Sequence, residues 1–198
     1  MPSFRSDACV GLSDKEIIQF SLQDIDFFAC VVLKYEQRLS SYIQKISQST
    51  EAEAQDILQE AFIKIWKNLN GFDERLSLDS WIFRIAHNET ISFWRKKTSF
   101  GKDKIVSTDN EKIKYLLSDE EISDFDLEQA ENIIEKILPS LKQEYREVLV
   151  LKYLEDKSYE EISDILKIPE GTVATRINRA KKAFKSFSHG KIDTSILN

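Results

Sequence analysis

Glycine and proline are scarce in this chain, which has five Gly and three Pro among 198 residues. A protein built of many short strands and turns needs more of both, and no run of alternating apolar and polar residues is long enough for a sheet. These absences favour an all-α fold. The length allows two hydrophobic cores, so the sequence predicts two small helical domains rather than one large one.

The chain also has no long hydrophobic run. No stretch approaches the about 18 consecutive apolar residues of a membrane span, and the N-terminus, MPSFRSDACVG, lacks the features of a secretion signal. We therefore expect a cytoplasmic protein with no membrane insertion. Cys9 and Cys30 are the only cysteines. Without a secretion signal they are expected to be reduced thiols, and a disulfide or redox switch is the less favoured alternative.

Catalytic and metal-binding motifs are missing as well. There is no Gly-rich phosphate loop, no HExxH, and no Ser or Cys nucleophile in a recognisable setting. The two His and two Cys do not have the spacing of a metal site. The sequence therefore predicts no enzyme, no cofactor and no metal, and it favours a packed or solvated role for His87 over a ligand.

The net charge of −6 is located in one segment. Residues 102–131 contain ten Asp or Glu against four Lys, so the rest of the chain is neutral overall. Weak hydrophobic periodicity there favours a flexible tether, with a short helix over 112–117 as an option. The acidity would keep this tether away from phosphates.

The basic C-terminal segment 157–185, KSYEEISDILKIPEGTVATRINRAKKAFK, has the pattern of a helix-turn-helix. Ser158 and Glu161 have the spacing of a capping box for the first helix. Pro169 and Gly171 predict the turn, because Pro restricts the residue before it and Gly supplies backbone freedom. The second helix is expected to begin at or just before Thr172.

The second helix separates an apolar stripe from a cationic one. Val173, Ile177, Ala180 and Phe184 would face inward. The outward stripe, which has hydroxyls and cations suited to the major groove of DNA, comprises Thr172, Thr175, Arg176, Arg179 and Lys182. A merely solvated helix face is the alternative, but the cap, turn and buried stripe agree with a DNA-binding unit.

A second amphipathic helix is predicted over 53–69. Its wide apolar band indicates burial, and it comprises Ile57, Leu58, Ala61, Phe62, Ile65, Trp66 and Leu69. The other face carries acidic and amide groups with one apolar side chain, namely Asp56, Gln59, Glu60 and Ile63, together with Lys64. Periodicity alone leaves open whether this face is a protein docking surface or an ordinary solvated one.

A polar loop over 70–79 and an aromatic, basic segment over 80–97 follow this helix. Rings beside cations are suited to single-stranded nucleic acid. Phe72 and Asn88 are the residues we assign to possible contact with extruded bases. We assign four other side chains mainly to packing, namely Trp81, Ile82, Ile85 and Phe93.

Three segments, in order, resemble the signature regions of an alternative bacterial sigma factor of the extracytoplasmic-function group, in the sigma-70 family. They are DILQEAFIKIWKNL (56–69), SWIFRIAHN (80–88) and LPSLKQEYREVLVLKYLEDKSYEEISDILKIPEGTVATRINRAKKAF (138–184). The likeness covers about residues 27–187. It implies an N-terminal extension (1–13), a region 2 domain (14–100), an acidic linker (101–126), a region 4 domain (127–188) and a tail (189–198).

The resemblance implies partners and site residues for each domain. Region 2 would bind the β′ clamp helices of core RNA polymerase through Asp56, Gln59, Glu60 and Ile63, which favours the docking alternative. The pocket for a flipped minus-10 base, with its neighbouring backbone contacts, would involve Lys64, Asn70, Phe72, Asp73, Arg84 and Asn88. Region 4 would read the minus-35 duplex through Thr172, Thr175, Arg176, Asn178, Arg179 and Lys182. The β flap is a further implied partner. The acidic overall charge and the exposed apolar docking face suggest that an anti-sigma factor masks the free protein by wrapping between the two domains.

The sequence departs from the family pattern at Ala174 and Asn178, so minus-35 readout is expected to be weaker or differently specified. It also departs at His87, where small or apolar residues are common in the family. A regulator that binds only duplex DNA, with an N-terminal protein-interaction domain, is the alternative. The face at 56–63 and the aromatic, basic segment favour the sigma factor.

Overall fold

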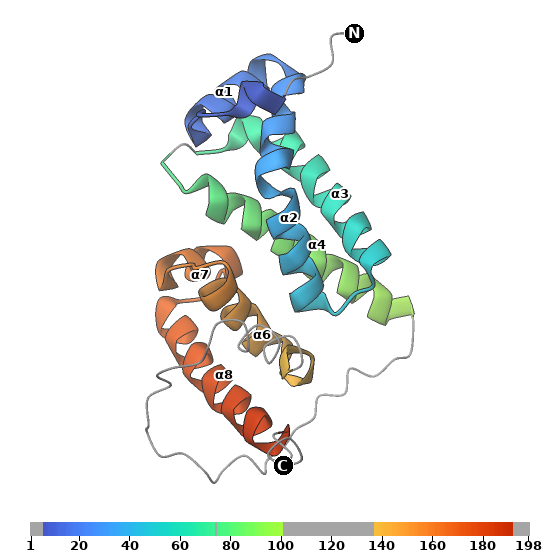
Figure 1. Cartoon of the computed structure of the whole chain (residues 1–198), viewed down its shortest axis with the longest axis vertical. Helices are drawn as coiled ribbons and strands as arrows, with labels where there is room; N and C mark the ends of the chain where they lie inside the picture. Colours follow the sequence, from blue (N-terminus) through green and yellow to red (C-terminus); the bar gives the residue numbers. More distant parts are fainter. Residues whose placement is uncertain (1–5, 74, 101–136, 192–198) are drawn as a thin grey trace, which may run out of the picture. The chain divides into compact units, whose positions relative to one another are not determined.

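The structure is a computed structural model that describes residues 6–73, 75–100 and 137–191. Every regular element in these ranges is helical, which confirms the prediction of an all-α fold. The chain forms two compact units, one N-terminal and one C-terminal (Figure 1). No helix within the described ranges is long and apolar enough to cross a membrane. The acidic segment 102–131, with its optional short helix, lies outside the described residues.

The N-terminal unit is built around three long helices. They are α2 (Phe28–Ser47), α3 (Glu51–Asn68) and α4 (Leu78–Phe100), which lie side by side in Figure 1. Shorter elements complete the unit, namely η1 (Ser6–Cys9), α1 (Asp14–Gln23), η2 (Ile25–Phe27) and η3 (Leu69–Gly71). Contacts of α1 with α2 and with η3 place it at one end of the three-helix core.

The core of this unit is large and aromatic. Tyr42 and Phe83 are fully buried, and their ring centroids lie 5.2 Å apart in an edge-on arrangement. Aliphatic side chains from all three long helices are buried as well, including Leu39, Ile43, Ile46, Ile57, Ile65 and Ile82. Such a core holds the faces of α3 and α4 in fixed register with each other.

Capping residues determine where two of these helices begin. The Ser13 and Thr50 side chains each accept the backbone N–H of the third helical residue, and Glu16 and Glu53 each accept the N–H of the cap in return. The helix predicted over 53–69 is α3, which begins two residues earlier because of the Thr50 capping box. The segment predicted over 80–97 belongs to α4.

Cys9 and Cys30 form a disulfide, which corrects the expectation of reduced thiols. Their Cα atoms lie 5.4 Å apart, within the usual range for a disulfide. The reason is the path of the chain, because α1 and η2 return it so that η1 lies beside the start of α2. Spacing along the sequence does not reveal this proximity.

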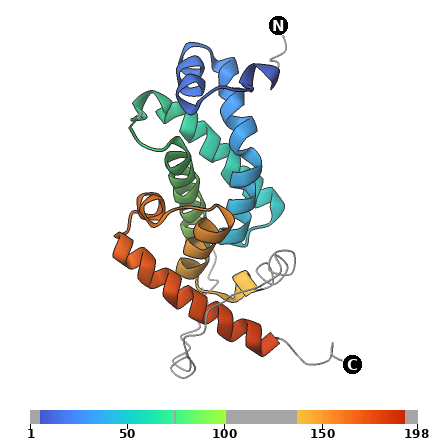
Figure 2. The ribbon, with the colours of Figure 1, turned by 60° about the vertical axis from the view of Figure 1, so that its left-hand side comes forward.

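The C-terminal unit is smaller and mostly aliphatic. Its elements are η4 (Leu138–Ser140), α6 (Gln143–Leu149), a π-helical turn η5 (Val150–Leu154), α7 (Tyr159–Leu166) and α8 (Glu170–Lys191). The long helix α8 packs across α6 (Figure 2). Buried side chains from four elements meet in the core, including Val148, Leu151, Ile162, Ile165, Val173, Ile177 and Ala180.

The turn between α7 and α8 differs in one detail from the prediction. The capping box is present, since Glu161 N–H donates to Ser158 Oγ at 3.1 Å and Ser158 N–H donates to Glu161 at 2.8 Å. However, Lys167 takes the left-handed conformation with φ of 54°, and Gly171 lies in the first turn of α8. The Pro169 carbonyl accepts the N–H of Thr172 and so starts the second helix. Gly171 is therefore not the turn residue.

Candidate protein and nucleic-acid interfaces

The outer face of α3 presents four exposed residues, Asp56, Gln59, Glu60 and Ile63. Their spacing puts them on one side of the helix, opposite the buried Ile57, Leu58, Ala61 and Ile65. Ile63, at the C-terminal end of this polar face, is 44% exposed. We call these four residues the α3 outer face. A large apolar side chain among carboxylates and an amide is suited to a protein partner that supplies both an apolar contact and donors.

Lys64 lies beside the α3 outer face and is held by an ion pair. Its Nζ lies 2.5 Å from Oε1 of Glu89 on α4. The lysine side chain remains about half exposed, at 47%. The pair links α3 to α4 and directs one cation toward the α4 side of the unit.

The segment after α3 carries the predicted base-contact residues. Asn70, in η3, is exposed, and Phe72 is half-buried. The Phe72 ring packs on Trp81 of α4, with centroids 5.1 Å apart and planes tilted by 59°. Trp81 is itself buried, so it forms a rigid support for Phe72. This contact joins the loop to α4.

Asp73 is engaged by Arg75, a residue that the sequence analysis missed. The Arg75 guanidinium donates through Nε at 2.9 Å and through Nη2 at 2.7 Å to the Asp73 carboxylate. These hydrogen bonds hold the pKa of Asp73 below its usual value and raise that of Arg75. The Arg75 N–H also donates to Asp73 Oδ1, which makes an Asx turn. The Asp-x-Arg spacing is the signal that would have identified the pair.

One face of α4 continues the surface that begins at Phe72. Trp81, Arg84 and Asn88 are three and four residues apart, so they share a side of the helix. Asn88 is exposed and Arg84 is half-buried. We call the set Asn70, Phe72, Asp73, Arg84 and Asn88 the loop–α4 surface, and it combines a ring, two amides, a carboxylate and a cation.

His87 and Phe83 belong to the core and not to this surface. The His87 ring is buried, and its Nδ1 lies 3.0 Å from the Tyr42 hydroxyl. Burial lowers the pKa of His87 to about 4, so the ring is neutral at physiological pH. Phe83 is fully buried against Tyr42. Some of the aromatic side chains in residues 80–97 therefore pack in the core.

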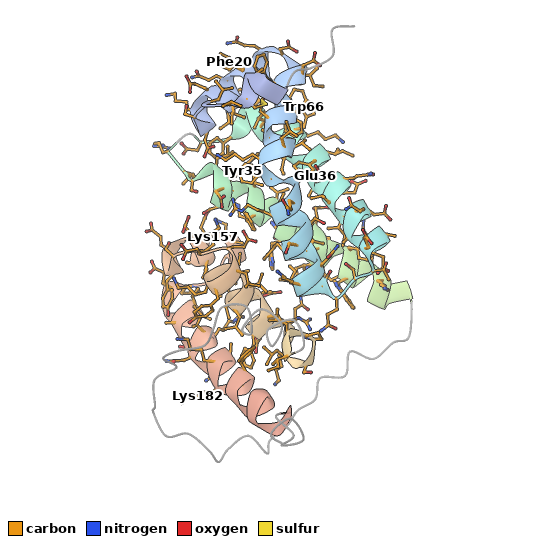
Figure 3. The ribbon with its side chains drawn as sticks, in the orientation of Figure 1. Phe20, Tyr35, Glu36, Trp66, Lys157 and Lys182 are labelled. Atoms are coloured by element: carbon orange, nitrogen blue, oxygen red, sulfur yellow. A yellow bond between two sulfur atoms is a disulfide. The ribbon has the colours of Figure 1, made fainter. Side chains whose placement is uncertain are left out.

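The outward face of α8 carries the predicted duplex-reading residues. Thr175, Asn178, Arg179 and Lys182 are exposed, whereas Thr172 and Arg176 are half-buried. Figure 3 labels Lys182 on this helix. Two members also have internal contacts: Thr175 Oγ1 donates to the Gly171 carbonyl at 2.8 Å, and Arg176 Nη2 lies 3.7 Å from Glu144 Oε2 of α6. We call the six residues the α8 outer face.

The described part of the chain holds no group of three or more His, Cys, Asp or Glu that could bind a metal. The α3 outer face, the loop–α4 surface and the α8 outer face are instead polar or cationic surfaces of the two units. Their chemistry is suited to binding macromolecules.

Comparison with known proteins shows the family to which the chain belongs. Residues 31–100 match the family Sigma-70 region 2, and residues 131–184 match Sigma-70, region 4. The two matches define a protein of the sigma-70 class, with regions 2 and 4 in separate helical units.

Individual relatives show which group of sigma-70 proteins the chain resembles. The chain is 36% identical over 177 residues to the ECF RNA polymerase sigma factor SigW of Bacillus subtilis (strain 168), covering 86% of this chain and 94% of the relative. It is 29% identical over 163 residues to the ECF RNA polymerase sigma-E factor of Escherichia coli (strain K12), covering 79% and 83%. The chain belongs to the extracytoplasmic-function (ECF) sigma factors.

Two solved structures share the fold. CnrH in complex with the cytosolic domain of CnrY gives a TM-score of 0.65 at 20% identity, covering 90% of this chain and 98% of CnrH. The sigma factor RpoE in complex with the anti-sigma factor NepR from Bartonella quintana gives a TM-score of 0.61 at 24% identity, covering 84% of this chain and 98% of the RpoE chain.

Membership of the family establishes the general activity. The protein directs transcription initiation as a non-enzymatic subunit of RNA polymerase, and both the polymerase and DNA are its partners. This confirms the predicted sigma factor and the absence of an enzymatic role. It also removes the alternative of a regulator that binds only duplex DNA.

Proposed function

We propose that the α3 outer face docks on the β′ clamp helices of core RNA polymerase. The support is the exposed Ile63, which follows Asp56, Gln59 and Glu60 along one face of a helix whose other face is buried. A partner helix that covers Ile63 would gain apolar burial, and cationic side chains around it would pair with the carboxylates. This face is the observation that carries the proposal.

We further propose that the loop–α4 surface captures a flipped base of the minus-10 element. Phe72, supported by Trp81, offers an aromatic face against which a base can stack. Asn70 and Asn88 offer amide donors and acceptors for a base edge. Arg84 and Lys64 would lie near the phosphates, and Arg75 would keep Asp73 oriented when the base enters. Their contacts would offset the few kcal/mol that flipping costs.

The α8 outer face would read the minus-35 element as duplex. Arg179 is exposed and can donate a bidentate pair to guanine, while Thr172 and Thr175 can approach base edges. Lys182 would contact a phosphate. Arg176 and Asn178 complete the set, with Arg176 near the carboxylate of Glu144.

Other partners follow from the same assignment. The C-terminal unit would also bind the β flap, and the free protein would be held by an anti-sigma factor, as the solved complex of RpoE with the anti-sigma factor NepR suggests. The domains would be residues 14–100 and 127–188, with an acidic linker at 101–126, and the protein would act in the cytoplasm, where the polymerase is.

The test is transcription by core RNA polymerase with the purified chain on a randomised promoter library. Specific initiation from a shared two-element motif supports the assignment of both DNA-reading surfaces. If the start sites share only one element, the assignment of the other surface is wrong.

The docking surface needs its own variants. Asp56→Arg reverses the charge in the α3 outer face and should abolish assembly with core polymerase, because it places a cation where we propose that cations of the clamp bind. Glu36→Arg on α2 makes the same change of charge at another exposed site (Figure 3) and should leave assembly intact. Wild-type affinity of Asp56→Arg would show that the docking surface lies elsewhere.

A further inference from the structure

The Cys9–Cys30 disulfide joins the N-terminal turn η1 to the first turn of α2. Its two sulfurs differ in accessibility, since Cys30 is only 2% exposed and Cys9 is half-buried. Val10, next to Cys9, is 81% exposed, and Gly11 then turns the chain with φ of 81°. A reagent in solution can therefore approach the bond from the side of Cys9.

We propose that Cys9 and Cys30 form a reversible thiol–disulfide site that exchanges with dithiol reductants and adjusts how firmly α1 holds η3. Family membership supports a reversible disulfide, because a subunit of RNA polymerase works in a compartment that keeps most thiols reduced. A disulfide within reach of solvent in such a protein would be opened and closed rather than permanent. The effect on η3 goes beyond the proposed base capture, and its consequence for initiation rests on that proposal.

The exchange balances as a two-electron reaction. A thiolate of the dithiol attacks Cys9 Sγ and forms a mixed disulfide, while Cys30 leaves as a thiolate. The second thiol of the reductant then attacks the reductant sulfur that is bonded to Cys9 Sγ. This closes the disulfide of the reductant and releases Cys9 as a thiolate. The dithiol becomes a disulfide, and its two protons end on the two cysteines.

The position of Cys30 supports its role as the leaving group. It is the third residue of α2, within the turn whose N–H groups point toward the helix start. The positive end of the helix dipole stabilises a thiolate there, although burial opposes that effect. Attack at Cys9 is thus favoured both by access and by the site at which negative charge develops.

The two cysteines are 21 residues apart, and all of α1 and η2 lies between them in the sequence. The disulfide therefore closes a loop that contains both elements. Reduction should release η1 and the turn at Gly11. It should leave α1 folded, since Ile17 and Ile18 are buried and Asp14 pairs with Lys34 of α2. What changes is the freedom of α1 to move against its neighbours.

One of those neighbours is η3, which α1 contacts directly. This turn contains Asn70 and leads into Phe72, both in the loop–α4 surface. A closed disulfide would keep η3 ordered before DNA binds, which lowers the ordering cost of base capture. The oxidised form should therefore open promoters more readily than the reduced form.

The first experiment establishes the redox site in the full chain. After mild oxidation no thiol should react with an alkylating agent, and after dithiothreitol both should, with a single two-electron transition between the states. Trp66, Trp81 and Trp94 all lie in the N-terminal unit, so tryptophan fluorescence reports its melting. The melting temperature should fall on reduction in the wild type and stay constant in Cys9→Ser. Two thiols that stay reactive under oxidant would overturn the proposal.

The second experiment tests the consequence. Hydrogen exchange across residues 69–73 should rise several-fold on reduction, and open-complex formation by the holoenzyme should decrease several-fold. Cys9→Ser, in which Cys30 stays available for packing, should match the reduced wild type with and without dithiothreitol. If exchange rises while open-complex formation is unchanged, the redox site is supported and the minus-10 assignment fails. If exchange at 69–73 does not respond, the coupling to η3 is wrong.

Discussion

The two helical units bury polar groups in different ways. In the N-terminal unit the buried polar side chains are neutral, and Ser21, Ser47 and Thr90 each donate to the carbonyl four residues earlier in the same helix. In the C-terminal unit two adjacent ionisable residues of α6, Arg146 and Glu147, are buried. The N-terminal core therefore holds neutral polar groups, bonded within one helix or, for His87 and Tyr42, between helices. The C-terminal core encloses charge.

The charged pair is costly where it lies. Burial raises the pKa of Glu147 to about 6 and lowers that of Arg146, so loss of hydration outweighs their mutual attraction. Arg146 Nη1 reaches the carbonyls of Pro139 and Leu141 only at 3.4 Å. A hydrogen bond of 2.9 Å from Gln143 and the charge of Arg176 partly compensate Glu147.

This difference between neutral and charged buried groups affects how each unit presents its surface. A large apolar core lets the N-terminal unit hold three helices in register, so that Phe72 of the loop packs on Trp81 of α4. The small C-terminal unit places carboxylates under α8, and Glu144 lies 3.7 Å from the guanidinium of Arg176. There, the charge of the core and the charge of the α8 outer face are coupled.

Removal of a core ring should have the largest effect. Phe83→Ala should lower the free energy of unfolding of the N-terminal unit by about 3–5 kcal/mol, because it leaves a cavity beside Tyr42. Urea denaturation followed by tryptophan fluorescence measures it. Leu151→Ala, in the C-terminal core, is the control and should leave this fluorescence transition unchanged. A shift of that transition would show that the two cores do not unfold independently.

Loss of one cation from the α8 outer face should affect recognition without affecting folding. Arg179→Ala should cost about 1–3 kcal/mol of discrimination at one base pair of the minus-35 element. Lys182→Ala should instead weaken binding to all DNA sequences alike. It should also reduce the slope of log binding constant against log salt concentration by about 0.9. Equilibrium binding to a panel of duplexes at several salt concentrations separates the two. Equal losses on every duplex for Arg179→Ala would contradict its role in base readout.

The two units should respond to pH with opposite sign. Because the pKa of Glu147 is raised to about 6 from the usual 4.5, folding favours its protonated form. Stability of the C-terminal unit from this residue is therefore highest below about pH 4.5, and up to about 2 kcal/mol is lost as the pH rises through 6. Hydrogen exchange of α6 at pH 4.5 and 7 measures the change.

Glu147→Gln keeps an oxygen that can accept the hydrogen bond of Gln143 and should remove this pH dependence. In the N-terminal unit, hydrogen bonds lower the pKa of Glu16 and of Glu53, so their contribution is lost as the pH falls. A pH dependence in Glu147→Gln equal to that of the wild type would assign it to other groups.

Loss of a cap should have the smallest effect, and it should differ between the units. Ser158→Ala should cost about 1–2 kcal/mol, because α7 has only eight residues and depends on its capping box. Thr50→Ala should cost about 0.5–1 kcal/mol, because α3 is longer and better packed. Chemical denaturation followed by circular dichroism and by tryptophan fluorescence measures both. A larger loss for Thr50→Ala would reverse this order.

Local sequence patterns were sufficient to predict α3, α7 and α8 and most of their exposed residues, although Thr172 and Arg176 are half-buried. The Ser158–Glu161 box, the start of α8 and the exposed α3 outer face all follow from interactions within a few residues of one another. The contacts of the candidate sites were not predictable in this way. Lys64 pairs with Glu89 and Arg176 approaches Glu144 because separate helices pack together. The Asp73–Arg75 pair is the exception, since it is local and was overlooked.

An all-α chain of the ECF sigma factors could be predicted from the sequence, since hydrophobic periodicity, caps and signature segments act through neighbouring residues. The side chains that meet across helices could not be predicted and were revealed by the folded structure. Packing placed Cys9 against Cys30, Phe72 on Trp81 and His87 against Tyr42. The physical reason is that such contacts depend on the return path of the chain and on the shared burial of apolar surface, neither of which any single segment encodes.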